Sequence, residues 1–235
     1  MLIRIAVVPY PPLLVPELTV RTGPRTEPVR GACLRATTSL TDSAAEWVAV
    51  GVDRRGPTVL EPDTAGTFAG YGVDVPVSLG GDRPAWDPEL PLPALVAGWL
   101  RQQAGAERVT VRLLAADTPT EQAAELGRQL GSAAAEFGLL VLAEGTNRQD
   151  ERSPHPPDPR ARRLDERLRS AVRDVDRREL LDLDPQLCAE LGVASRAAWQ
   201  CAAGAAGTGN WAGRLVYSDT PHGVTYHVGT WSRAA

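Results

Sequence analysis

The sequence predicts one α/β domain of three layers, αβα, with a mostly parallel central sheet, helices on both of its faces and a C-terminal β-hairpin. Short apolar runs alternate with amphipathic stretches through much of the chain, which is typical of a parallel sheet covered by helices. The chain has 235 residues, 43% hydrophobic and 23% charged, and therefore has ample apolar material for one sizeable core. Two strand-like runs near the C-terminus predict the hairpin.

The first half of the chain contains two of the expected central strands. Its expected elements are strands at 2–8 and 47–52, a weak helix at 29–41, and strand-like pieces at 58–60 and 73–79. Region 56–90 is rich in Gly, Pro and Asp. Since so polar a piece could not bury a core alone, we expect a loop-and-hairpin insertion within a single domain that spans residues 1–235.

The second half of the chain alternates more regularly and then becomes helical. Its expected elements are helices at 91–104, 119–137, 159–176, 177–182, 184–191 and 195–205, and strands at 109–114, 139–142, 214–217 and 224–228. The helix at 159–176 carries an apolar stripe that includes Leu164 and Leu168. Its i,i+4 pairs, Asp165–Arg169 and Asp174–Arg178, predict a solvated polar face.

Composition and charge exclude several classes of protein. The net charge is −4, all 25 basic residues are Arg and only 5% of residues are aromatic, so the chain lacks the basic, aromatic surface that nucleic acid requires. No apolar run approaches the ~20 residues that cross a bilayer, and the first run is too short for a secretory signal. We therefore expect a cytoplasmic protein without nucleic-acid or membrane partners.

The chain has three cysteines, Cys33, Cys188 and Cys201. Their odd number and wide spacing predict buried, reduced thiols.

Several segments resemble one family when taken in order. The segment Pro9-Tyr10-Pro11-Pro12, directly after the first strand, resembles the His-Pro-Pro opening of the LigB-like proteins, the catalytic-subunit family of class III extradiol ring-cleavage dioxygenases. The later segments that are similar to this family are 164–167 and 180–185 in its helical region, 196–205 in its Trp-containing helix, and 221–226, which resembles a closing Pro-Tyr-Gly-Val-x-Tyr of actinobacterial relatives. The resemblance spans most of the chain and implies the same α/β fold.

The resemblance also implies a chemistry whose residues this chain lacks. In the family, two His and one carboxylate hold a ferrous ion that binds a catechol and dioxygen, with open coordination positions for both. The first His ligand falls on Tyr10, and the second position follows the strand at 47–52, where the chain has Asp53-Arg54-Arg55. The carboxylate, which comes about four residues before the family's Trp, falls on Ser195, ahead of Trp199. We therefore expect no bound metal.

The acid/base His of the family is missing as well. Its position falls in Gly145-Thr146-Asn147-Arg148, and no His precedes His155. His155 lies in a charged, Pro-rich loop, and His222 and His227 are five residues apart, so on a regular strand they would point to opposite faces. His222 is either a residue of the pocket mouth or a turn residue. Arg148 either binds an anionic ligand or is solvated, and Trp199 belongs to the core or to a pocket wall.

Three functional hypotheses follow. The first, which the sequence favours, is a LigB-like protein that has lost its metal site and is not an enzyme. It binds a small molecule or serves in the assembly of a complex. The second is a ferrous-dependent extradiol-type oxygenase with an atypical site around Tyr10 and Asp53, the one case that needs Fe(II). The third is a metal-free enzyme that uses Asp53, Arg148 and His222. A small aromatic or anionic ligand fits all three, and homo- and hetero-oligomers both stay open. No Gly-x-Ser-x-Gly elbow is present to indicate a serine hydrolase.

Overall fold

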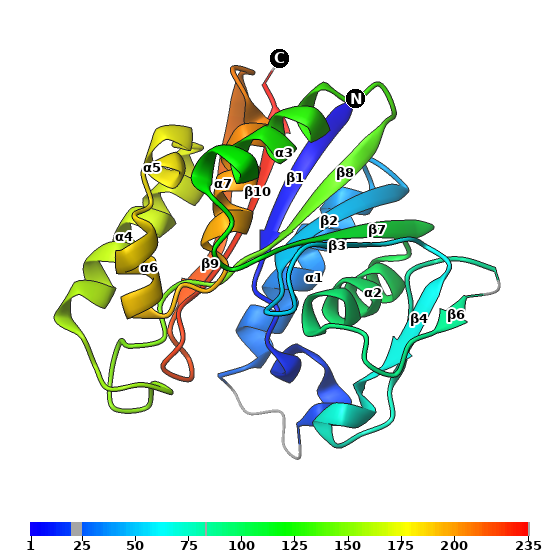
Figure 1. Cartoon of the computed structure of the whole chain (residues 1–235), viewed down its shortest axis with the longest axis horizontal. Coiled ribbons are helices and arrows are strands. Elements are labelled where there is room, and N and C mark those ends of the chain that lie inside the picture. Colours follow the sequence, from blue (N-terminus) through cyan, green and yellow to red (C-terminus); the bar gives the residue numbers. More distant parts are fainter. Residues whose placement is uncertain (20–24, 83, 235) are drawn as a thin grey trace.

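A central sheet of seven strands organises the chain, which a computed structural model describes over residues 1–19, 25–82 and 84–234 (Figure 1). The strand order is β3-β7-β2-β8-β1-β10-β9. These strands are β1 (Leu2–Val8), β2 (Glu46–Val52), β3 (Thr58–Leu60), β7 (Arg108–Leu114), β8 (Phe137–Leu142), β9 (Trp211–Asp219) and β10 (Tyr226–Arg233). The four inner strands β7, β2, β8 and β1 are parallel, and β3, β10 and β9 run antiparallel to their neighbours. The predicted α/β class, the parallel centre of the sheet and the terminal hairpin are confirmed, and the sheet as a whole is mixed.

Helices cover both faces of this sheet and bury two apolar cores (Figure 1). One face carries α1 (Glu27–Thr41) and α2 (Leu92–Ala104). The other face carries α3 (Thr120–Ser132), α4 (Pro159–Asp174), α5 (Arg177–Leu181), α6 (Pro185–Leu191) and α7 (Arg196–Ala206). Side chains of β1 alternate between the two cores, as strand geometry requires: Ile5 and Val7 face one, Ala6 and Val8 the other.

The expected insertion at 56–90 is more ordered than a loop and hairpin. Its first strand, β3, extends the main sheet, and a separate three-stranded sheet follows, with β4 (Thr64–Thr67) between β5 (Pro76–Ser78) and β6 (Ala85–Trp86). Short 3-10 helices occur here at Phe68–Tyr71 and, after β1, at Pro12–Leu14 and Pro16–Leu18. Phe68, Val77 and Leu79 are buried in the core that α1 and α2 cover. The insertion is therefore part of that core.

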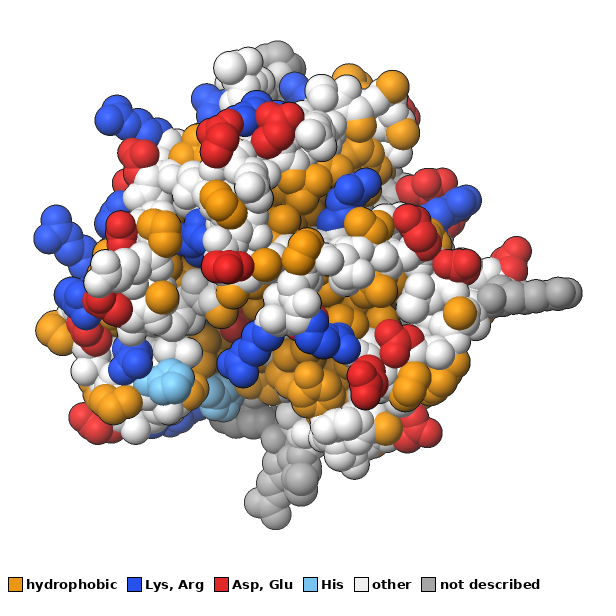
Figure 2. All heavy atoms as spheres, viewed as in Figure 1, with side chains coloured by type: hydrophobic (Ala, Val, Ile, Leu, Met, Phe, Trp, Pro, Cys, Tyr) orange, Lys and Arg blue, Asp and Glu red, His pale blue; other side chains and the backbone are white. Residues whose placement is uncertain are grey.

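Three further expectations need correction. The helix predicted at 119–137 ends at Ser132, because Phe137 and Gly138 pair with β1 and therefore belong to β8. The predicted Asp165–Arg169 pair does not form: Asp165 is 5% exposed and accepts its hydrogen bonds from inside the protein. The predicted Asp174–Arg178 pair does not form either, because Asp174 pairs with Arg173 and Arg178 with Asp182. A solvated face is nevertheless present, since Arg and acidic side chains are intermixed over α4 to α6 (Figure 2) and pair there, as Arg160 does with Glu190.

Close backbone contact joins α3 to α7. A Cβ atom at Gly127 would lie 2.1 Å from the carbonyl oxygen of Cys201, and one at Gly204 would lie 2.2 Å from that of Ala124. Both positions therefore require glycine.

Cys33, Cys188 and Cys201 are free and buried, as predicted. None of the described helices combines the length and the apolar character that crossing a bilayer requires.

Candidate functional site

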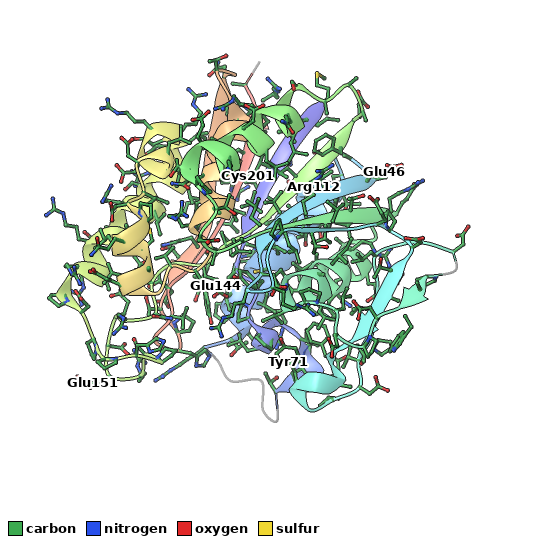
Figure 3. The ribbon with its side chains drawn as sticks, in the orientation of Figure 1. Glu46, Tyr71, Arg112, Glu144, Glu151 and Cys201 are labelled. Carbon is green, nitrogen blue, oxygen red and sulfur yellow. The ribbon has the colours of Figure 1, made fainter. Side chains whose placement is uncertain are left out.

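The carboxyl ends of three parallel strands meet at one edge of the sheet. Tyr10 follows β1, Asp53 follows β2 and Glu144 follows β8. Glu144, which is labelled in Figure 3, marks this edge. The connection after β1 leads to α1 on one face of the sheet, whereas the connection after β8 leads to α4 on the other. Adjacent strands whose connections leave to opposite faces form a topological switch point, where open α/β sheets bind ligands. Tyr10 and Glu144 stand at this point.

Glu144 is the central residue of this edge, and sequence reasoning missed it. Its Oε1 accepts a hydrogen bond of 3.3 Å from the backbone N–H of Tyr10. Burial raises the pKa of the Glu144 carboxyl to about 7, although the bond from Tyr10 acts in the opposite direction. A carboxyl group with this pKa exchanges its proton near neutral pH, as general acids and bases do. Its place directly after an apolar strand was the signal that could have found it.

Ser195 and Trp199 hold the main chain of Glu144. The Ser195 hydroxyl accepts a bond of 2.8 Å from the Glu144 N–H and donates one of 3.1 Å to the Glu144 carbonyl oxygen. Trp199 Nε1 donates to the same carbonyl oxygen at 3.1 Å. Both side chains are buried, Trp199 completely. Trp199 is therefore a core residue, and Ser195 is a clamp on the loop after β8.

The other groups at this edge are phenols and a carboxylate. Burial, with Glu144 and Asp53 nearby, raises the pKa of Tyr10 well above its usual value, so the phenol stays neutral. Burial and Glu144 also raise the pKa of Tyr226 on β10. Asp53 Oδ2 forms a 3.0 Å ion pair with Arg55, and its Oδ1 accepts a bond from the Arg54 N–H. The edge thus presents neutral hydroxyls and acidic oxygens.

This set of residues does not fit the ferrous ion that the resemblance implies. No imidazole belongs to it, the Ser195 hydroxyl is engaged by the Glu144 backbone, and Asp53 is paired with Arg55. Over residues 1–19, 25–82 and 84–234, no three His, Cys, Asp or Glu side chains are placed to hold one metal ion. Two His and a carboxylate on one side of the ion are therefore not reproduced.

Three of the expected site residues lie elsewhere. The Asn147 side chain packs against Gly192, and its backbone N–H donates to the Leu191 carbonyl oxygen at 3.2 Å. Arg148 donates to the Pro156 carbonyl oxygen at 3.3 Å, within its own loop. His222 is an exposed turn residue whose Nε2 lies 3.1 Å from Thr26 Oγ1. The structure thus brings together Tyr10, Asp53, Ser195 and Trp199 but not these three.

A second polar group, centred on Asp165 of α4, lies behind Trp199. Asp165 accepts bonds from the Thr146 N–H at 2.9 Å, the Thr146 hydroxyl at 2.6 Å and the Thr225 hydroxyl at 2.7 Å, and also from the Gln149 amide. His227 Nε2 lies 3.8 Å from Asp165 Oδ1. The His227 ring meets the Trp199 ring edge-on, with centroids 6.4 Å apart. The sequence did contain a signal, because Asp165 falls between Leu164 and Leu168 on the buried stripe of α4.

Comparison with known proteins supports the fold. The chain is similar to the uncharacterised protein JW3007 of Escherichia coli K12, whose crystal structure matches 97% of this chain and 99% of its own with a TM-score of 0.57 and 14% sequence identity. At this identity the similarity concerns the fold alone. No family model matches the chain, and no curated protein matches it.

Proposed function

We propose that this chain is a cytoplasmic LigB-like protein that binds a small aromatic molecule at the switch point between β1 and β8 without a resident metal. The observation that carries the proposal is the meeting of Tyr10 and Glu144 there, joined by the bond from the Tyr10 N–H to the Glu144 carboxylate. Ligands of open α/β sheets bind in this position. The pattern Pro9-Tyr10-Pro11-Pro12 supports the family assignment.

The groups at the site favour a ligand that donates hydrogen bonds. Glu144, Asp53 and the two phenols of Tyr10 and Tyr226 offer acceptor oxygens. An anionic ligand fits less well, because Arg148 bonds to Pro156 and Arg152 pairs with Asp150. A ring that carries hydroxyl or amino groups therefore suits the site better than a carboxylate or phosphate.

One observation favours a second candidate, a metal-free enzyme at the same site. A Glu144 pKa of about 7 lets this carboxyl take up and release a proton at neutral pH. Such an enzyme would move a proton to or from a hydroxyl or amino group of the ligand. In this candidate Glu144 replaces the expected trio of Asp53, Arg148 and His222.

The first experiment measures iron, zinc and manganese in protein purified without chelator. The proposal expects less than a stoichiometric amount of each metal, and one equivalent of any of them together with ferrous-dependent oxygen uptake on catechol would support the oxygenase reading instead.

The second experiment is a thermal-shift screen against phenols, anilines and aromatic acids. Phenols or anilines should stabilise the wild type and Glu151→Gln, an exposed control, but not Glu144→Gln. A screen without any stabilising ligand, or equal shifts in both variants, would contradict the proposal. Turnover of a stabilising ligand that Glu144→Gln lacks would favour the enzyme.

A further inference from the structure

A serine and a histidine of the β9–β10 hairpin lie beside an aspartate of α4. Ser218 and His227 face each other in the register of the two strands, and Ser218 Oγ lies 2.9 Å from His227 Nδ1. The opposite ring nitrogen, Nε2, lies 3.8 Å from Asp165 Oδ1 and has no hydrogen-bond partner among the described residues, although His227 is only 1% exposed. None of these three residues belongs to the switch-point site.

A cavity opens on these three residues. Its volume is about 350 Å³, within the range of small-molecule sites. Ser218, His227 and Asp165 all line it, and every other lining side chain is polar or charged. Arg162 and Arg169 of α4 supply two cations, and neither is in an ion pair within the described part of the chain. The cavity can therefore accept a small hydrophilic molecule, and it offers no surface for a long acyl chain.

We propose that Ser218 and His227 form a second reactive centre, in which Ser218 is acylated by a small hydrophilic ester, with Asp165 as the positioning residue. An activated serine requires a base within about 2.6–3.2 Å and a third group that orients the base. The distance between Ser218 Oγ and His227 Nδ1 lies within this range. The distance between His227 Nε2 and Asp165 Oδ1 exceeds that of a hydrogen bond, but such contacts are often long in the absence of substrate and tighten in its complex.

The charge on Asp165 supports its positioning role. Burial acts to raise the pKa of Asp165, but the neighbouring His227 and the hydroxyls of Thr146 and Thr225 outweigh burial and hold that pKa below its usual value. An ionised carboxylate beside Nε2 favours the tautomer with its proton on Nε2. This tautomer leaves Nδ1 free to accept the proton of Ser218.

The reaction balances with water as the second substrate. Ser218 Oγ bonds to the ester carbonyl carbon while its proton moves to His227 Nδ1, and Arg162 and Arg169, which line the same cavity, supply positive charge for the negative oxygen that forms. When the carbon–oxygen bond of the ester breaks, the alcohol leaves with the proton from Nδ1. Water, deprotonated by His227, then cleaves the acyl group from Ser218 as a carboxylic acid and restores the hydroxyl. The nucleophile elbow of many serine hydrolases is absent, since Ser218 lies on an edge strand.

A fluorophosphonate probe tests the proposal on the full-length protein. The probe forms a phosphorus–oxygen bond with an activated serine and releases fluoride. The expected result is one adduct per chain by intact mass, mapped by peptide analysis to Ser218 and lost when the protein is unfolded first. No adduct, or an adduct on another residue, would overturn the proposal without the need for any variant.

Variants then separate chemistry from folding. Ser218→Ala should abolish both labelling and p-nitrophenyl acetate hydrolysis, whereas Ser232→Ala, a serine on β10 opposite Ala212, should change neither. His227→Gln should slow labelling by at least ~10²-fold, the usual effect of losing a general base. Asp165→Asn should slow labelling of Ser218, whereas Asp165→Glu, which keeps a carboxylate beside His227, should recover part of the labelling rate. Labelling of folded Asp165→Asn at the wild-type rate would refute the role of Asp165.

Discussion

Replacement of Glu144 by Gln tests the electrostatic description of the switch-point site. Gln keeps the shape of the side chain and an acceptor for the Tyr10 N–H but cannot ionise. In the folded chain the Glu144 pKa rises from the usual 4.5 to about 7. Since one pKa unit corresponds to about 1.4 kcal/mol, the difference amounts to about 3 kcal/mol of folding free energy.

The sign of this effect follows from proton binding. Between pH 4.5 and about 7 the unfolded chain loses the Glu144 proton while the folded chain keeps it, so the stability of the wild type falls as the pH rises. The contribution is fully present below pH 4.5 and is lost above about pH 7. Glu144→Gln should therefore match the wild type near pH 4.5 and be more stable by up to about 3 kcal/mol at pH 8.

Urea denaturation of both proteins between pH 4.5 and 8 measures this difference. Glu151→Gln, an exposed substitution of the same kind, serves as the control for the loss of one carboxylate. A Glu144→Gln difference that stays constant with pH would refute the reasoning, because it would show that the folded chain does not hold the Glu144 proton.

Three further substitutions test the packing around the two polar groups. Ser195→Ala removes both hydroxyl bonds to the Glu144 backbone and should lower the free energy of unfolding by about 1–3 kcal/mol in urea titrations. Asp165→Asn should cost at least about 2 kcal/mol, because an amide cannot accept every bond that the carboxylate accepts, and a thermal scan with an unchanged Tm would contradict this. Gly127→Ala should cost more than about 1–3 kcal/mol through its clash with Cys201, whereas Gly70→Ala, with open space around it, should be nearly neutral by calorimetry.

The sequence predicted the central strands well because they are buried on both faces. The runs at 2–8, 47–52 and 109–114 match β1, β2 and β7 to within one residue. The strand-like pieces at 58–60 and 73–79 correspond to β3 and β5. The strands β4 and β6 and the small sheet that they form with β5 were not predicted, since two- to four-residue strands with partly polar sequences form only where tertiary contacts select them.

The site was predicted in part, for a physical reason. Tyr10 and Asp53 were found because they directly follow apolar strands, and Ser195 and Trp199 because the family resemblance marked their helix. Glu144 obeys the first of these rules as well, but the resemblance assigns it no role, because the family's acid/base His falls on the residues that follow it. The charge of Asp165 and its spacing from Arg169 predict a solvated residue, whereas its position on the apolar stripe of α4 indicates burial.

Trp199 makes the two polar groups of this protein neighbours that share a wall. Its indole N–H holds the Glu144 carbonyl oxygen, and its ring edge contacts the His227 imidazole. A shift of either group therefore displaces one rigid ring that the other contacts, so occupancy of one centre should change the affinity of the other by the same factor in both directions. A double-mutant cycle of Glu144→Gln and His227→Gln, read as free energies of unfolding, measures the coupling between the two groups, and strictly additive free energies would contradict it.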